Sequence, residues 1–226
     1  MSRHALSEKR PFLLASIAAA VAYFFLRDAE LPEILAVAVK GAAVALLAAY
    51  AWQRHSSSDA RSIAWVMAIG ALGDIAVEYS QEIGGLLFFL GHLIAIALYW
   101  RHRREALTPS QKAAVVVLLL LTPAIAWLLP EDRTAAQGVA LYALALGGMA
   151  ASAWASSFSR YRVGVGALLF VASDLLIFAE MGPLSQSPIP HWTIWPAYYC
   201  GQFLICVGVL QSLRKRDPEL RLVSSN

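Results

Sequence analysis

Long apolar stretches alternate with short polar connections along the whole chain. The stretches cover residues 12–26, 34–52, 62–79, 84–100, 113–129, 135–158, 163–181 and 194–213. The connections are rich in Pro, Ser or charged residues, as is typical of loops. Because about 20 apolar residues carry a helix across a bilayer, the pattern predicts an all-α membrane protein with eight transmembrane helices. We expect a single eight-helix transmembrane domain over residues 1–226, since no connection is long enough for a further domain.

Composition excludes a soluble protein and a nucleic-acid-binding protein. Hydrophobic residues make up 59% of the chain and charged residues 15%, and the mean hydropathy is +0.59. These values lie outside the range of soluble globular domains. The net charge of +3 does not indicate a nucleic-acid ligand, because the cations stand at the ends of the predicted spans, where membrane topology accounts for them.

The first apolar stretch is predicted to be a span rather than a cleaved signal peptide. It follows Arg3, Lys9 and Arg10, as the apolar part of a signal peptide would. However, Arg27 and Asp28 come directly after it, where a cleavage site would need small residues.

Lysine and arginine are strongly biased toward one side of the predicted bundle. Fifteen of the 18 lie in the two termini and in the connections 54–61, 101–112 and 160–162. The opposite side has two, Arg27 and Arg133, and the remaining cation, Lys40, lies inside the second span. Because positive side chains stay preferentially in the cytoplasm, both the N- and the C-terminus are predicted to be cytoplasmic.

Few polar side chains lie inside the predicted spans, and each is a candidate for a buried site because an ionisable group is costly in hydrocarbon. Counted from the nearest cytoplasmic arginine at about 1.5 Å per residue, five of them fall at similar depth, about 14 to 21 Å from that side. These five are Lys40, Asp74, His92, Asp174 and Gln202. Glu78 and Glu180 fall nearer the outer surface, and Tyr198 and Tyr199 share the last span with the glutamine. We expect the five to form one buried site.

Several of these residues also have an ordinary structural explanation. Lys40 could extend its long side chain to the outer interface, and Glu78 could be solvated near the end of its span. His92 could bond a neighbouring helix without any chemistry, and the two tyrosines could belong to the interfacial aromatic belt. The two aspartates are harder to explain in this way, because a short carboxylate in mid-span does not reach water. They are the strongest candidates.

Pairs of a small and a polar residue occur twice at similar spacing. The pairs are Gly73-Asp74, Gly91-His92, Ser173-Asp174 and Gly201-Gln202. The third and fourth spans would then correspond to the seventh and eighth, offset by 100 residues for the aspartates and by 110 for the second pair. Because both helix pairs run in the same direction, this suggests two parallel four-helix repeats.

These positions resemble the YhhN-type lysoplasmalogenase family of eight-span membrane proteins. The resemblance rests on Lys40 in the second span, Gly73-Asp74, FFLGH at residues 88–92, GALLFVASD at 166–174 and YYCGQ at 198–202. It covers essentially the whole chain. The sequence departs from the family pattern at Gly41, where proline is expected, and at Ala95, where an aromatic residue is usual.

The resemblance implies a lysoplasmalogenase. Such an enzyme hydrolyses the vinyl ether bond of a lysoplasmalogen to a fatty aldehyde and glycerophosphoethanolamine or glycerophosphocholine. The partners that it implies are a lysophospholipid substrate and the lipid bilayer, and its expected location is the inner membrane of a bacterium. We expect no cofactor and no metal ion, and we make no prediction of the oligomeric state.

Cleavage of a vinyl ether needs an acid and an anion. Protonation of the outer carbon leaves an oxocarbenium ion, and water captures this ion to give a hemiacetal that collapses to aldehyde and alcohol. One carboxyl group supplies the proton and an ionised carboxylate stabilises the cation, as in glycosidases. Asp74 and Asp174 are the catalytic candidates, and either could be the acid. The substrate-binding candidates, which would contact the phosphate or orient water and headgroup, are Lys40, Glu78, His92, Tyr198, Tyr199 and Gln202.

One other class of membrane protein stays open as an alternative. A proton-coupled transporter would also place carboxylates and a lysine near the midplane. An intramembrane aspartyl protease is expected to carry Gly-x-Gly-Asp, whereas residues 71–74 are ALGD. A zinc-dependent lipid hydrolase needs several histidines at one depth, and only His92 is there. The chain has no Gly-x-Ser-x-Gly motif of a serine hydrolase.

Overall fold

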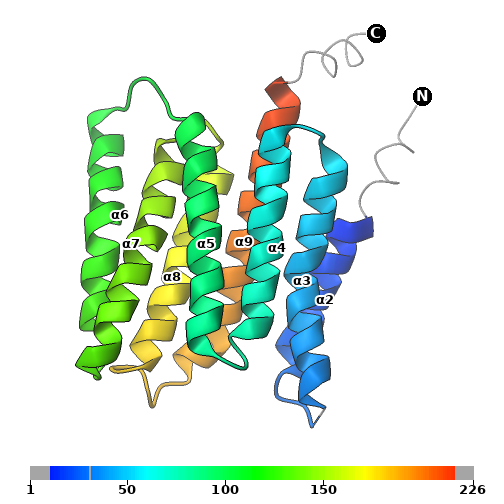
Figure 1. Cartoon of the computed structure of the whole chain (residues 1–226), viewed down its shortest axis with the longest axis vertical. Coiled ribbons are helices and arrows are strands. Elements are labelled where there is room, and N and C mark those ends of the chain that lie inside the picture. The colour runs from blue at the N-terminus through cyan, green and yellow to red at the C-terminus, as the bar shows by residue number, and fades with distance from the viewer. Residues whose placement is uncertain (1–10, 31, 217–226) are drawn as a thin grey trace. The chain divides into compact units, whose positions relative to one another are not determined.

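The computed structural model describes residues 11–30 and 32–216, and this part of the chain is built from helices (Figure 1). The helices are α2 (Pro11–Leu26), α3 (Glu33–Arg54), α4 (Ser58–Ala76), α5 (Gln81–Arg101), α6 (Pro109–Leu128), α7 (Arg133–Ala155), α8 (Val165–Glu180) and α9 (Ile189–Arg216), with a π-helical turn, η1 (Arg160–Gly164), leading into α8. One helix stands at each predicted apolar stretch, so the all-α prediction is confirmed.

Six of these helices are long and apolar enough to cross a bilayer, namely α3, α5, α6, α7, α8 together with η1, and α9. The chain is therefore a multi-pass membrane protein. Helix α2 is apolar but has only 16 residues, and α4 carries Asp59, Arg61 and Asp74. The count of eight spans stays a prediction. So does the cytoplasmic location of the two termini, which lie outside the described residues.

Several of the predicted helix boundaries differ from the observed ones by three to five residues. Helix α4 ends at Ala76 rather than at residue 79, because the chain turns back and the Tyr79 N–H donates to the Ala76 carbonyl at 3.0 Å. Helix α7 ends at Ala155 rather than at residue 158, because Ser156 pairs with Arg103 in an isolated β-bridge. The last helix begins at Ile189, ahead of the predicted residue 194.

Polar residues at the helix starts satisfy backbone N–H groups that lack a partner within the helix. The Ser57 side chain accepts a hydrogen bond from the first turn of α4. Thr108 and Gln111 form a reciprocal capping box at the start of α6. Asp132 accepts a hydrogen bond from the Thr134 N–H at 2.8 Å at the start of α7. These caps explain why the connections rich in Ser, Thr and Asp interrupt the apolar stretches where they do.

The chain divides into two compact units. Unit 1 comprises Met1–Gly91 and Cys206–Asn226, and unit 2 comprises His92–Ile205. Both boundaries fall inside helices, one in α5 and one in α9. Each unit therefore draws on both of the predicted four-helix halves. The parallel repeat and the single transmembrane domain over 1–226 stay predictions.

In unit 1, α2 packs on α3 and α3 packs on α4, and Figure 1 shows the three side by side. The interior contains the fully buried side chains of Leu47, Ile63 and Met67. Small residues allow this close packing. A Cβ atom added to Gly73 would meet the Phe88 ring at 3.0 Å, so the glycine that precedes Asp74 makes room for an aromatic ring of α5.

In unit 2, α6 packs along α7, and α8 packs against both. The backbones of α8 and α9 approach closely at two glycines. A Cβ added to Gly166 would meet the Gly201 carbonyl oxygen at 2.8 Å, and a Cβ added to Gly201 would meet the Gly166 carbonyl oxygen at the same distance. Any larger residue at either position would push these helices apart, together with the polar residues that they carry.

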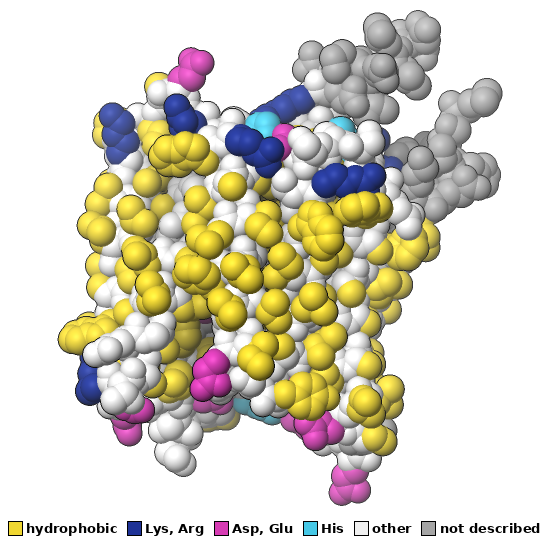
Figure 2. Space-filling view, in the orientation of Figure 1, with side chains coloured by type: hydrophobic (Ala, Val, Ile, Leu, Met, Phe, Trp, Pro, Cys, Tyr) yellow, Lys and Arg dark blue, Asp and Glu magenta, His cyan; other side chains and the backbone are white. Residues whose placement is uncertain are grey.

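Charged side chains gather at the helix ends and hydrophobic ones cover the sides of α5 and α6 (Figure 2). At the end of unit 2 where α5 and α7 finish, the described cations are Arg101, Arg103, Arg104, Lys112, Arg160 and Arg162. At the other end of unit 2, Arg133 is the one described cation, beside the acidic residues Glu131, Asp132 and Glu180. This asymmetry is the one on which the predicted orientation depends.

Candidate functional site

Asp174 lies at the centre of a buried polar cluster in unit 2. It stands on α8 and is 5% exposed. The Tyr142 hydroxyl of α7 donates to Asp174 Oδ2 at 2.6 Å, and the Ser173 hydroxyl donates to Oδ1 at 3.2 Å. Among the described residues Asp174 forms no ion pair. Its hydrogen-bond partners are thus hydroxyl groups on two helices.

His92 joins the same cluster through Tyr142. The Nε2 atom of His92 lies 3.1 Å from the Tyr142 hydroxyl, and the imidazole, 4% exposed, comes from α5. Its ring packs edge-on against Phe170, with centroids 5.0 Å apart. Tyr142 therefore connects an imidazole to a carboxyl group, and an aromatic ring fixes the orientation of that imidazole.

Helix α9 adds a second polar pair to the cluster. The Gln202 side-chain amide donates to the Tyr198 hydroxyl at 3.2 Å, and both residues are buried. The Tyr198 ring packs on Phe170 from the side of α9, with centroids 5.2 Å apart. Tyr198 is also near enough to Tyr142 to interact with it electrostatically. Phe170 is thus the apolar residue shared by His92 and Tyr198.

Unit 1 holds a second cluster, and this one contains a cation. The Lys40 ammonium of α3 pairs with Glu78, which follows the end of α4. Asp74, one turn earlier on α4 and 2% exposed, interacts electrostatically with the same ammonium. The Lys40 Nζ lies 5.8 Å from the centre of the Tyr23 ring of α2. Lys40 thus forms an ion pair rather than extending alone to the interface.

The structure therefore places the predicted residues in two groups. The group in unit 2 contains His92, Asp174, Tyr198 and Gln202. The group in unit 1 contains Lys40, Asp74 and Glu78. The Tyr199 ring stacks on Trp195 at 6.1 Å and packs against Phe203 along its own helix. The expectation of one site for all of them stays a prediction.

Tyr142 is the residue that sequence reasoning missed, together with the supporting side chains Ser173, Phe170 and Tyr23. Tyr142 stands in an apolar stretch rich in Ala and Leu, where a tyrosine attracts no attention. Its depth would have revealed it. It lies 13 residues before the end of α7 at Ala155, which is about 20 Å along the helix and the same depth as the predicted site.

The cluster in unit 2 can move a proton. A hydroxyl between a carboxyl and an imidazole accepts from one partner and donates to the other, so the chain from His92 through Tyr142 to Asp174 can run in either direction. Within residues 11–30 and 32–216, no three His, Cys, Asp or Glu side chains are grouped so as to hold a metal ion. The chemistry that these side chains offer is acid–base chemistry.

Comparison with known families gives a match that covers most of the chain. The YhhN family model matches residues 35–209, a region that includes both polar clusters except for Tyr23. Comparisons with the curated proteins and with the solved structures give no significant match. The match is to the same family that the sequence motifs resemble. The chain belongs to the YhhN family, the lysoplasmalogenase-type family of membrane proteins.

Proposed function

We propose that this protein is a lysoplasmalogenase that hydrolyses the vinyl ether bond of a lysoplasmalogen. The products are a fatty aldehyde and glycerophosphoethanolamine or glycerophosphocholine. Membership of the YhhN family supports the proposal. The observation that carries it is the buried Asp174 carboxyl, which accepts a hydrogen bond from Tyr142 while Tyr142 contacts His92. Family membership does not favour the transporter alternative.

Asp174 is the proposed proton donor. An ionised carboxylate buried without a cation is costly, and the partners of Asp174 are hydroxyl groups. Asp174 transfers its proton to the outer carbon of the vinyl ether, whose double-bond electrons form the new C–H bond. The resulting carboxylate then faces an oxocarbenium ion, whose positive charge it stabilises.

Water completes the reaction. It attacks the oxocarbenium carbon and loses a proton to the Asp174 carboxylate, which returns to its starting form. The hemiacetal then breaks its C–O bond, giving the aldehyde and the glycerol hydroxyl. Tyr142 and His92 would exchange this proton with Asp174 along their hydrogen bonds, since each group can both accept and donate. One water is consumed, and the residues end unchanged.

The unit 1 cluster is proposed to act through charge. Lys40 is a cation beside two carboxylates, Asp74 and Glu78. A neighbouring cation stabilises the ionised form of a carboxylate, so Asp74 suits the part of the anion and Asp174 that of the acid. Lys40 also remains the candidate for contact with the substrate phosphate. The hypothesis that both aspartates serve one reaction depends on the sequence prediction of a shared site.

The test is an aldehyde assay on purified, detergent-solubilised protein in ordinary water and in D₂O. Three lysolipids with the same headgroup and chain length are compared, which differ in a vinyl ether, an alkyl ether or an acyl ester linkage. We expect aldehyde from the vinyl ether alone, because only its double bond accepts a proton on carbon. In D₂O the promptly trapped aldehyde should carry one deuterium next to the carbonyl. No aldehyde from folded protein, over a range of pH and headgroups, would contradict the proposal.

A further inference from the structure

A second polar site is present in unit 2, at the helix ends remote from Asp174. The segment after α5 lies against the segment after α7. The Arg104 N–H donates to the Ala155 carbonyl at 3.1 Å, and the Ser157 N–H donates to the His102 carbonyl at 2.7 Å. The Arg104 side chain is fixed as well, because its Nε atom donates to the Ser156 carbonyl at 2.8 Å. The guanidinium of Arg104 is thereby held at one position.

Arg160 begins η1 beside this segment and carries unsatisfied donors. Its Nε and Nη2 atoms are buried, yet they have no hydrogen-bond partner in the part of the chain that the structure describes. The same is true of the indole Nε1 atom of Trp154. A Cβ added to Gly164 would lie 2.9 Å from the Trp154 ring and 3.6 Å from Arg160 Cβ. The two side chains are therefore neighbours, and leaving their donors unpaired is costly.

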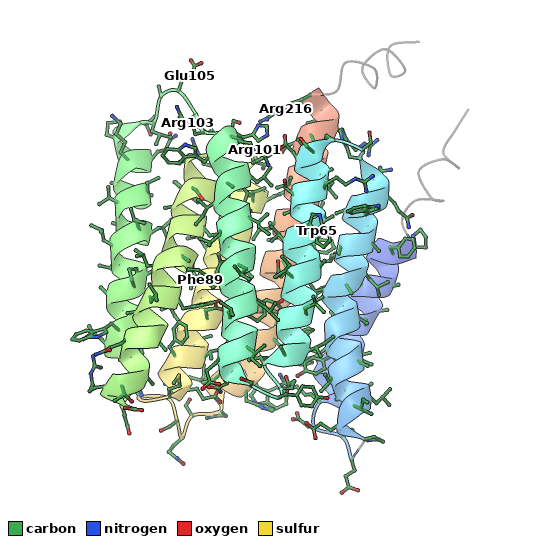
Figure 3. The ribbon with its side chains drawn as sticks, in the orientation of Figure 1. Trp65, Phe89, Arg101, Arg103, Glu105 and Arg216 are labelled. Atoms are coloured by element: carbon green, nitrogen blue, oxygen red, sulfur yellow. The ribbon has the colours of Figure 1, made fainter. Side chains whose placement is uncertain are left out.

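The charge at this place is positive and uncompensated by an ion pair. Burial lowers the pKa of the Arg104 guanidinium, and the nearby charge of Arg160 lowers it further. Neither arginine forms an ion pair with any described residue. Figure 3 shows Arg101 and Arg103 at the same end of α5, while Glu105 stands at the tip of the following loop and points away. The guanidinium charges of Arg104 and Arg160 lie close together without an ion pair to any described carboxylate, so a bound anion would stabilise them.

The backbone adds to the attraction. Arg160 is the first residue of the continuous helical segment formed by η1 and α8. The N-terminal end of a helix carries a partial positive charge and favours anions. The segment runs from Arg160 to Asp174, which at about 1.5 Å per residue is about 20 Å. The site is thus distinct from the cluster of Asp174.

We propose that Arg104, Arg160 and Trp154 form a binding site for a phosphate group. Two guanidinium groups match the charge of a phosphate, and the buried N–H donors of Arg160 and Trp154 supply hydrogen bonds to its oxygens. The phosphate belongs either to the headgroup of a bilayer phospholipid or to a free phosphate ion. Both sources present the same oxygens to the site.

The experiment titrates purified, delipidated full-length protein with inorganic phosphate and, separately, with a short-chain phosphatidylglycerol. The midpoint of thermal unfolding is followed at constant ionic strength set by sodium chloride. We expect a rise in the midpoint for the wild type. A rise with inorganic phosphate identifies the free ion as sufficient, and a rise with the lipid alone identifies the headgroup. No rise with either compound would overturn the proposal.

Two variants and a matched control separate the site from general surface charge. Arg160→Gln removes the buried donors and should weaken binding about tenfold or more, because hydrogen bonds to a charged group are worth about 1.5–3 kcal/mol. Arg162→Gln removes an exposed arginine two residues away and should bind as the wild type does. Equal losses in both variants would overturn the proposal. Trp154→Phe keeps an aromatic ring and removes the indole N–H. This variant is the test if Arg160→Gln does not fold, and unchanged affinity in it would then refute the site.

Discussion

The two aspartates that follow a small residue in the sequence have different neighbours in the two units. In unit 1, Glu78 forms an ion pair with the Lys40 ammonium, and Asp74 interacts electrostatically with the same ammonium. In unit 2, Asp174 accepts hydrogen bonds from Tyr142 and from the adjacent serine, and Tyr142 in turn contacts an imidazole. One aspartate therefore belongs to a charged cluster, and the other to a cluster of uncharged hydrogen-bond donors.

These different neighbours explain how one residue type can take two chemical roles. Enzymes that stabilise oxocarbenium ions use two carboxyl groups whose surroundings separate their acidities. A cation beside Asp74 suits a carboxylate that stays ionised, whereas hydroxyl partners beside Asp174 suit a group that gives and regains a proton. The proposed roles follow from these neighbours, and substitutions in each cluster should have different consequences.

The largest effect is expected from Asp174→Asn. The amide keeps the size of the side chain but has no acidic proton, so the turnover number should fall about 10²–10⁴-fold, the usual contribution of general acid catalysis. The measurement is aldehyde release from the vinyl-ether lysolipid, with the thermal unfolding midpoint as the check on folding. Glu180→Gln is the matched control, since Glu180 is an exposed acid on the same helix. Near-normal turnover in Asp174→Asn would remove this residue from the mechanism.

Tyr142→Phe should have the next largest effect. It removes the hydroxyl between Asp174 and His92 without changing the ring. Tyr142 donates to the carboxylate that forms when Asp174 gives up its proton. A hydrogen bond to a charged group is worth about 1.5–3 kcal/mol, so its loss corresponds to about a 10- to 100-fold decrease in turnover number. Because the hydroxyl is proposed to exchange a proton with Asp174, KM should stay unchanged while the pH profile shifts. Tyr50→Phe, at a buried tyrosine of α3, is the control. A lower turnover number with an unshifted pH profile would mean that Tyr142 has a packing role alone.

Substitutions in the charged cluster should lower stability as well as turnover, because Asp74 is also the proposed anion and Lys40 the proposed phosphate contact. Lys40→Met leaves Asp74 and Glu78 without their cation, and the Lys40 side chain is only 14% exposed. We expect a loss of about 2 kcal/mol, less than the roughly 3–5 kcal/mol of a fully buried pair. Glu78→Gln should cost less, because the Glu78 side chain is 33% exposed and Lys40 keeps Asp74.

A double-mutant cycle tests this part of the comparison. The Lys40→Met/Glu78→Gln protein should regain some of the stability that Lys40→Met loses, since one unpaired carboxylate is removed with the cation. Thermal unfolding midpoints of the four proteins provide the measurement. Additive losses, with no recovery in the double variant, would show that the ion pair contributes nothing.

The positions of the helices could be predicted because each is an apolar run bounded by proline, serine or charge. Their ends were predicted less well, because they depend on contacts between distant segments. The end of α7 is an example, since Ser156 pairs with Arg103, which lies 53 residues earlier. Hydropathy contains no information about such a contact. The same holds for the tight turn after Ala76, which places Glu78 beyond the end of α4.

The candidate residues could be predicted from their depth, but their grouping could not. Depth along a helix follows from the residue number, whereas the direction of a side chain depends on which neighbour its helix packs against. Tyr198 and Tyr199 show this, because they are adjacent in sequence but Tyr198 packs on Phe170 and Tyr199 packs on Phe203. Tyr142 was missed for another reason, since a search for ionisable groups passes over an uncharged hydroxyl.

The smallest effect is expected from Asp132→Asn. Asp132 and Asp174 have the same kind of hydrogen-bond partner but differ in burial. Like Asp174, Asp132 accepts hydrogen bonds from a hydroxyl, that of Thr134, but it is exposed at the start of α7. The Thr134 hydroxyl and N–H groups hold the pKa of Asp132 below its usual value. A lowered pKa contributes stability above the unfolded-state value, near about 4, and that stability is lost as the pH falls through the folded-state pKa.

Asparagine caps a helix about as well as aspartate does but does not titrate. The wild type should therefore unfold at a slightly higher temperature than Asp132→Asn at pH 7, and the two midpoints should converge as the pH falls through the lowered pKa of Asp132. The measurement is a series of thermal unfolding curves for both proteins from pH 7 downward. A difference between the two midpoints that persists in acid, or no difference at pH 7, would show that the hydroxyl and N–H groups of Thr134 do not favour the charged form of Asp132. Hydroxyl partners would then not explain the behaviour of an exposed carboxylate, and burial would be left as the dominant influence on Asp174 as well.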